Sequence, residues 1–169
     1  EQTILNKETL DELDKLFVAS FKIINKNDKI FSKRRYFSLN HGDPTRQNIF
    51  YKKGSLKLID WEFVRYDLKE WDLVFFVWAY DLNNKRKELF LNKYNYKKTT
   101  KAKKQFEIIY LTHCLDMLNW RIERLNLIYK KKINASQMYN TEEEMLNGIY
   151  EDIPKLKESI KRFSNLSKP

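Results

Sequence analysis

Asp43, Asn48 and Asp60 stand around a predicted β-hairpin, and their spacing constrains this chain more than any other sequence feature. Residues 41–48 read HGDPTRQN and lead into a short β-prone run, and a second such run ends at Asp60. Between the runs, residues 52–55 read KKGS and supply the glycine that a tight turn favours. The hairpin therefore predicts that Asn48 and Asp60, at its two outer ends, lie close enough to share one metal ion.

These side-chain types in this order have the chemistry of phosphoryl transfer. One carboxylate, Asp43, would orient an attacking hydroxyl, while Asn48 and Asp60 would hold Mg²⁺ against the phosphates of ATP. Two of them also have a structural interpretation, since Asp43 precedes Pro44 in a turn and Asn48 suits the capping of a loop end. Asp60 follows an apolar run and has no evident structural need, which favours the metal role.

The pattern resembles the aminoglycoside phosphotransferase and choline kinase superfamily, the small-molecule branch of the protein-kinase-like fold. The family signature is His-x-Asp, four residues, Asn, then Ile-Asp-x-Glu after a hairpin, and finally Asp-Leu. Here residues 59–62 read IDWE and residues 71–73 read WDL, most like the bacterial choline kinase type. Arg65 replaces the usual Gly and Lys69 the usual Pro, so we expect a differently shaped loop between the two motifs.

The resemblance implies an ATP- and Mg²⁺-dependent kinase that phosphorylates a hydroxyl group of a small molecule, with choline- or ethanolamine-like amino alcohols favoured. An aminoglycoside or sugar phosphotransferase of the same superfamily is one alternative. A lobe that binds a ligand or a partner protein without catalysis is another. The resemblance assigns Asp43 to catalysis, Asn48 and Asp60 to the metal, and His41 and Asp72 to structural support of the site.

For the substrate site, the resemblance implies aromatic side chains that hold a cationic head group by cation–π attraction. The candidate substrate-binding residues are Glu62, Asp116 and Trp120. Asp116 and Trp120 are four residues apart and therefore neighbours on one helix face. A core Trp and a solvated Asp are the competing interpretation, and Met117 stands where the family has a second Trp.

Composition is compatible with a single domain. The chain has 169 residues, of which 42% are hydrophobic, enough for one compact core. The single cysteine, Cys114, lies in an apolar helical pattern and is expected to be a buried thiol of a cytoplasmic protein. No apolar run is long enough to cross a membrane. The net charge of +10 favours polyanions such as nucleotides or nucleic acid. Because the basic residues are spread along the chain, a lysine-rich composition is the simpler explanation and a nucleic-acid-binding module is disfavoured.

Hydrophobic periodicity predicts several helices around the one hairpin. Asn6 is the expected N-cap of the first helix, Asp72 that of a buried helix over 73–80, and Thr141 opens a capping box. Pro154 is expected in the first turn of a separate last helix. The predicted helices cover 7–26, 73–80, 84–94, 102–130, 141–152 and the residues from 154 onward.

The predicted fold class is mainly α with a short β-hairpin, the C-terminal helical lobe of the protein-kinase-like fold, over a single domain, 1–169. Only one helix and a loop precede His41, so we expect the N-terminal nucleotide lobe to be absent, in a fragment or a reduced homologue. Such a chain is expected to transfer phosphate very poorly by itself and to expose an apolar patch that favours association.

Overall fold

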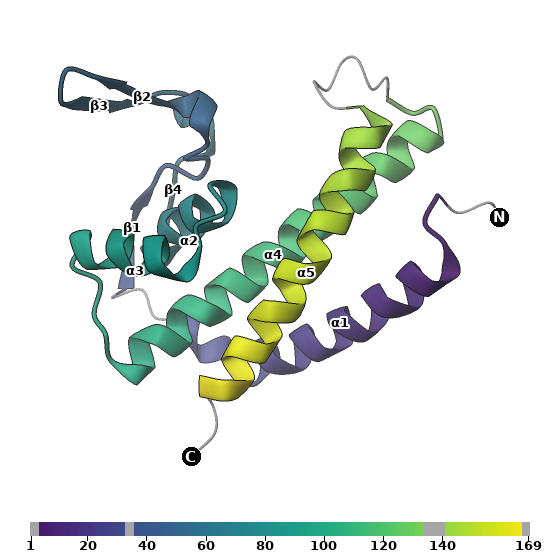
Figure 1. Ribbon diagram of the computed structural model, residues 1–169, viewed down its shortest axis with the longest axis horizontal. Helices are drawn as coiled ribbons and strands as arrows, with labels where there is room; N and C mark the ends of the chain where they lie inside the picture. The colour runs from purple at the N-terminus through teal and green to yellow at the C-terminus, as the bar shows by residue number, and fades with distance from the viewer. Residues whose placement is uncertain (1–3, 33–35, 134–140, 167–169) are drawn as a thin grey trace. The chain divides into compact units, whose positions relative to one another are not determined.

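The computed structural model describes residues 4–32, 36–133 and 141–166 (Figure 1). It is mainly helical with short antiparallel strands, as the sequence predicts. No helix within these ranges is long and apolar enough to cross a membrane. The helices are α1 (Lys7–Asn25), α2 (Glu70–Ala79), α3 (Asn84–Lys93), α4 (Thr100–Tyr129) and α5 (Glu142–Leu166), and the strands are β1 (Phe37–Asn40), β2 (Ile49–Lys52), β3 (Ser55–Leu58) and β4 (Arg65–Leu68).

The chain divides into two compact units, residues 27–110 and residues 1–26 with 111–169, and α4 runs from one into the other. Whether they form a single domain stays a prediction. The 27–110 unit contains two separate two-stranded sheets. The predicted hairpin forms from β2 and β3, with Tyr51 opposite Leu56, and β1 pairs with β4. The sequence missed β4, because its residues alternate charged and apolar side chains over too short a run to distinguish from a loop.

Helix α2 begins earlier than the sequence predicts. Lys69 occupies the N-cap position, and Asp72 lies inside the first turn, so the prediction that Asp72 caps this helix is wrong. The reason is that the Asp72 carboxylate binds backbone N–H groups of another segment, described below. Further along α2, Val74 and Val77 are buried and help to form the core of this unit.

In the other unit, the predicted helix starts are confirmed. The Asn6 side chain accepts a 2.8 Å hydrogen bond from the N–H of Thr9. The Thr141 hydroxyl and the Glu144 carboxylate each accept a hydrogen bond from the other's backbone N–H, which is the predicted capping box. Cys114 is fully buried, as expected. The core of this unit consists of aliphatic and aromatic side chains, among them Leu13, Leu118, Met145, Ile149, Leu156 and Phe163.

Pro154 does not start a separate helix. α5 continues through it from Glu142 to Leu166, so the predicted break is wrong. Proline removes one backbone hydrogen bond, to the carbonyl four residues before it. Both Pro154 and Tyr150 are exposed, so water can satisfy the Tyr150 carbonyl, while the buried side chains of Ile153 and Leu156 keep the helix packed on either side of the proline.

The side chain of Arg121, from α4, passes over Gly148 of α5 to reach Asp152. Arg121 Nε donates a 2.9 Å hydrogen bond to the fully buried carboxylate of Asp152. A Cβ atom on Gly148 would lie 2.0 Å from Arg121 Nη1. Gly148 therefore provides the space through which the guanidinium reaches Asp152, and Lys155 Nζ supplies the second cation, 3.3 Å from Asp152.

Gly148→Ala is expected to destabilise the chain by about 2 kcal/mol. Alanine gains about 1 kcal/mol over glycine within a helix, but the displaced Arg121 leaves a buried carboxylate short of a partner, which costs about 3 kcal/mol or more. Urea unfolding measures the difference. In an Arg121→Ala background, Gly148→Ala should stabilise the chain, because no guanidinium is left to displace. A loss of stability in both backgrounds would contradict the steric account.

Candidate active site

The loop between β1 and β2 brings Asp43 and Asn48 into direct contact. The Asn48 amide nitrogen donates to the Asp43 carboxylate at 2.8 Å and to the Asp43 backbone carbonyl at 3.0 Å. Asn48 is buried and Asp43 half-buried. These two hydrogen bonds fix the orientation of the Asn48 side chain. Its amide oxygen is the atom that can act as an acceptor or as a metal ligand.

Asp60 lies within electrostatic range of Asp43. Burial raises the pKa of the Asp43 carboxyl, and the negative charge of Asp60 raises it further, while the hydrogen bond from Asn48 lowers it. Asp60 itself is exposed and has a left-handed backbone conformation, with φ 61°. A carboxylate with a raised pKa accepts a proton more readily than an ordinary aspartate, which is the property required of a group that orients a reacting hydroxyl.

His41 connects the two segments that carry these residues. Its Nε2 lies 2.7 Å from the carbonyl oxygen of Ile59, and its Nδ1 lies 3.3 Å from the backbone nitrogen of Asp43. A carbonyl only accepts and an amide N–H only donates, so the contacts require the neutral ring with its proton on Nε2. Both ring nitrogens are engaged, and the ring is buried against Trp61, with 4.6 Å between centroids. This arrangement suits structural support and leaves no nitrogen for a general base.

The backbone around His41 is fixed from the other side by α2. The two oxygens of Asp72 accept hydrogen bonds from the N–H groups of His41 and Gly42, at 2.7 and 2.9 Å. Gly42 has a positive φ of 88°, and a Cβ atom there would lie 2.3 Å from the carbonyl oxygen of Phe63. The sequence indicated Asp72 as a support of the loop but missed Phe63, whose contact depends on backbone position and not on side-chain type.

The side-chain types of Asn48 and Asp60 suit a magnesium ion. Asn48 and Asp60 offer an amide oxygen and a carboxylate, which are ligands that Mg²⁺ prefers, and Mg²⁺ commonly takes only one or two protein ligands beside phosphate oxygens and water. Among the described residues no group of three or more His, Cys, Asp or Glu side chains is arranged to hold a metal. The described residues therefore do not form a complete set of metal ligands from these side-chain types by themselves.

The candidate substrate residues are divided between the two units. Glu62 is exposed on the short helical turn that follows Asp60. Asp116 is exposed and Trp120 half-buried on the part of α4 that belongs to the other unit. The Arg124 guanidinium lies 5.6 Å from the centroid of the Trp120 ring. A substrate cation at this ring would therefore share it with Arg124 or displace it.

Arg46, which the sequence placed inside the loop, stacks on an aromatic ring. Its guanidinium carbon lies 5.3 Å from the centroid of the Tyr80 ring, at the end of α2. The loop is thus attached to both ends of α2, through Asp72 and through Tyr80. The second contact could not be read from the sequence, because it joins residues far apart in the chain.

Several apolar side chains near Asp60 are exposed. Ile59 and Trp61 are each 46% exposed and Phe63 is 57% exposed. On the hairpin, which Figure 1 shows extending away from α2 and α3 of the same unit, Tyr51 is 73% exposed and Leu56 60%. Exposed apolar side chains are therefore present near the motif, while the predicted apolar patch and its effect on association stay predictions.

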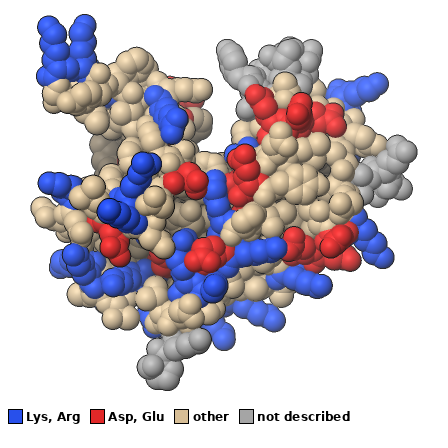
Figure 2. All heavy atoms as spheres, viewed as in Figure 1, with Lys and Arg blue, Asp and Glu red and all other residues tan. Residues whose placement is uncertain are grey.

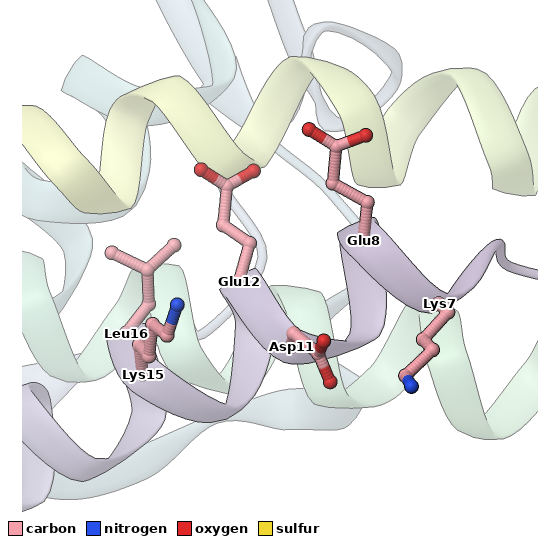
Figure 3. A pocket seen from close by; sticks show the side chains of 6 residues that line it. All are labelled: Lys7, Glu8, Asp11, Glu12, Lys15 and Leu16. Carbon is pink, nitrogen blue, oxygen red and sulfur yellow. The ribbon is translucent and has the colours of Figure 1, made fainter.

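Two other surface features do not contain the motif. An open groove of about 730 Å³ runs along α1 (Figure 3), lined by Lys7, Glu8, Asp11, Glu12, Lys15 and Leu16. In it Glu8 and Glu12 point toward α5 (Figure 3), and Lys157 pairs with Glu12. In the view of Figure 2, Lys and Arg side chains are interspersed with Asp and Glu.

Comparison with solved structures finds a likeness in fold. No family model and no curated protein matches the sequence. Among solved structures, the chain is similar to spectinomycin phosphotransferase, APH(9)-Ia, in complex with ADP and spectinomycin, with a TM-score of 0.42 and 16% sequence identity. The match covers 100% of this chain and 48% of that one. The chain thus spans about half the length of the solved structure that it matches.

Proposed function

We propose that this chain is the helical lobe of an ATP- and Mg²⁺-dependent kinase that phosphorylates a hydroxyl group of a small molecule. The observation that supports this most directly is the convergence of Asp43, Asn48 and Asp60 in one unit. Asn48 touches Asp43, and the charge of Asp60 acts on Asp43. His41 and Asp72 fix the backbone that carries them.

Each residue then has a defined task. Asp43 accepts a hydrogen bond from the acceptor hydroxyl and directs its oxygen at the γ-phosphate. Asn48 and Asp60 hold the metal, which when bound neutralises charge on the phosphates. His41 keeps Ile59, and with it the start of the Asp60 segment, attached to the Asp43 loop. Rate enhancement in such a site comes from positioning and electrostatics, with no covalent intermediate.

Binding of Mn²⁺ in the presence of ATP tests the metal site without requiring turnover. Mn²⁺ substitutes for Mg²⁺ and broadens the NMR signals of nearby nuclei. The amides of Asn48 and Asp60 should broaden first, and those of the α1 groove, such as Glu12, should stay sharp. Broadening at Glu12 alone would contradict the assignment. ADP release by the full-length gene product with choline, ethanolamine, sugar and aminoglycoside acceptors then tests the reaction.

The acceptor class proposed is a small cationic alcohol of the choline type, with its head group near Trp120 and the acidic side chain of Asp116 on the same helix. A cation on an aromatic face gains about 0.5–2 kcal/mol. Trp120→Leu in the full-length gene product should therefore raise the KM for choline roughly 3- to 30-fold with kcat little changed.

The control for this prediction is Trp61→Leu, which removes an indole from the ring contact with His41 and should lower kcat instead. An unchanged KM in a folded Trp120→Leu variant would assign Trp120 to the core. A sugar or another uncharged hydroxyl compound would then be the better acceptor hypothesis.

A further inference from the structure

Glu70 is a buried carboxylate that the proposed reaction does not use directly. It is 2% exposed at the first position of α2. One of its oxygens, Oε1, accepts a 3.0 Å hydrogen bond from the Tyr96 hydroxyl. Its other oxygen, Oε2, is buried without a hydrogen-bond partner among the described residues. Burial of a carboxylate with so few partners is unfavourable, so its position in the fold calls for an explanation.

The surroundings of Glu70 hold it in place. The Tyr96 hydroxyl proton is shared between Glu70 and the backbone carbonyl of Ala102, each 3.0 Å away. Burial, and then the neighbouring charge of Glu70, raise the pKa of Tyr96 well above its ordinary value, so Tyr96 keeps that proton. The negative charge of Glu70 at the N-terminal end of α2 is also favoured by the helix dipole. The first turn of α2 is thereby anchored to the start of α4.

That same turn carries Asp72. Asp72 lies two residues after Glu70, and its two oxygens hold the N–H groups of His41 and Gly42. A rotation of the first turn would move these oxygens away from both N–H groups at once. The next residue in the loop is Asp43, so the position of the catalytic carboxylate depends on where this turn is fixed.

We propose that Tyr96 and Glu70 are positioning residues for the Asp43 loop, acting through Asp72. They touch neither substrate nor metal in this assignment. Their role in catalysis rests on the proposed phosphotransferase function, whereas their hold on the loop can be measured without it.

Amide hydrogen exchange, resolved residue by residue by NMR, tests the inference on the 169-residue chain. Tyr96→Phe keeps the ring and removes the hydroxyl. It should speed exchange at the His41 and Gly42 amides roughly tenfold, because one hydrogen bond to a charged group is lost. The amide of Ile109, in the core of the same unit, should be unaffected. Tyr94→Phe, two residues away at a half-exposed ring, is the matched control and should leave all three unchanged.

Two variants at the partner complete the test. Glu70→Ala should reproduce the effect of Tyr96→Phe, and Glu70→Gln, which retains an acceptor oxygen, should restore slow exchange. Equal acceleration at Ile109 would show a general loosening of the unit and would overturn the proposal, as would unchanged exchange at His41 and Gly42. In the phosphotransfer assay of the full-length gene product, Tyr96→Phe should lower kcat and leave the KM of the acceptor unchanged. Absence of phosphotransfer in the full-length gene product and all its variants would reject the proposed function and leave the exchange result standing.

Discussion

Asp60→Asn is expected to reduce phosphoryl transfer by roughly 100-fold or more, because one of the two protein ligands proposed for the metal loses its charge. The fold should tolerate the change. Asp60 has φ 61°, and asparagine is among the few residues that adopt this region readily. The measurement is kcat/KM of the full-length gene product together with its melting temperature. A variant that melts normally but retains full activity would remove Asp60 from the site.

The same substitution has a second consequence that needs no enzyme assay. The negative charge of Asp60 contributes to the raised pKa of Asp43, so removing that charge should lower the Asp43 pKa. A reaction that requires the Asp43 carboxylate would then persist to lower pH in an otherwise competent site. Titration of the Asp43 carboxyl carbon by NMR measures the change in the 169-residue chain.

Glu62→Gln provides the matched control for this titration. It removes the same charge only two residues away, from an exposed side chain that does not contribute to the Asp43 shift. Its Asp43 titration should match that of the unmodified chain. An equal fall in both variants would mean that Asp43 responds to the general charge of this surface and not to Asp60 in particular.

The sequence predicted well the contacts between residues that are close together in the chain. Asn6 and Thr141 cap helices through N–H groups within three residues of themselves, so the sequence contains everything that decides the contact. The β2–β3 hairpin is equally local, since its two-residue turn consists of Lys53 and Gly54, both with positive φ.

Contacts between distant segments were harder to predict. The motif resemblance indicated Asp72 as a support of the loop, but its residue type also suits an N-cap, and nothing nearby in the sequence shows that the N–H groups of His41 and Gly42 take its carboxylate. β4 is defined by pairing with β1, about 28 residues earlier in the chain, and has no strong strand pattern of its own. The candidate site was predictable as a set of residues from the motif spacing. The contacts that hold it together, such as Tyr80 on Arg46, depend on tertiary structure.

Gly42→Ala is expected to be the most damaging single substitution in the Asp43 loop. Two effects add. A side chain at φ 88° is strained by about 1–2 kcal/mol, and the new Cβ would meet the Phe63 carbonyl oxygen at 2.3 Å, which neither backbone can accommodate without moving. We expect a total loss of about 3 kcal/mol or more. A loop shift of roughly 1 Å would also cost about 100-fold in the rate of phosphoryl transfer.

Gly54→Ala separates the two effects, because Gly54 has a similar φ of 80° but a Cβ added there would meet no atom within 4 Å. It should cost only the conformational part, about 1–2 kcal/mol. Gly42→Asn makes the complementary change, since asparagine tolerates positive φ but still carries a Cβ. Urea unfolding should therefore rank Gly42→Asn close to Gly42→Ala and well below Gly54→Ala in stability. If Gly42→Asn is instead as stable as the unmodified chain, the Phe63 carbonyl does not exclude a side chain at position 42, and the steric part of this account is wrong.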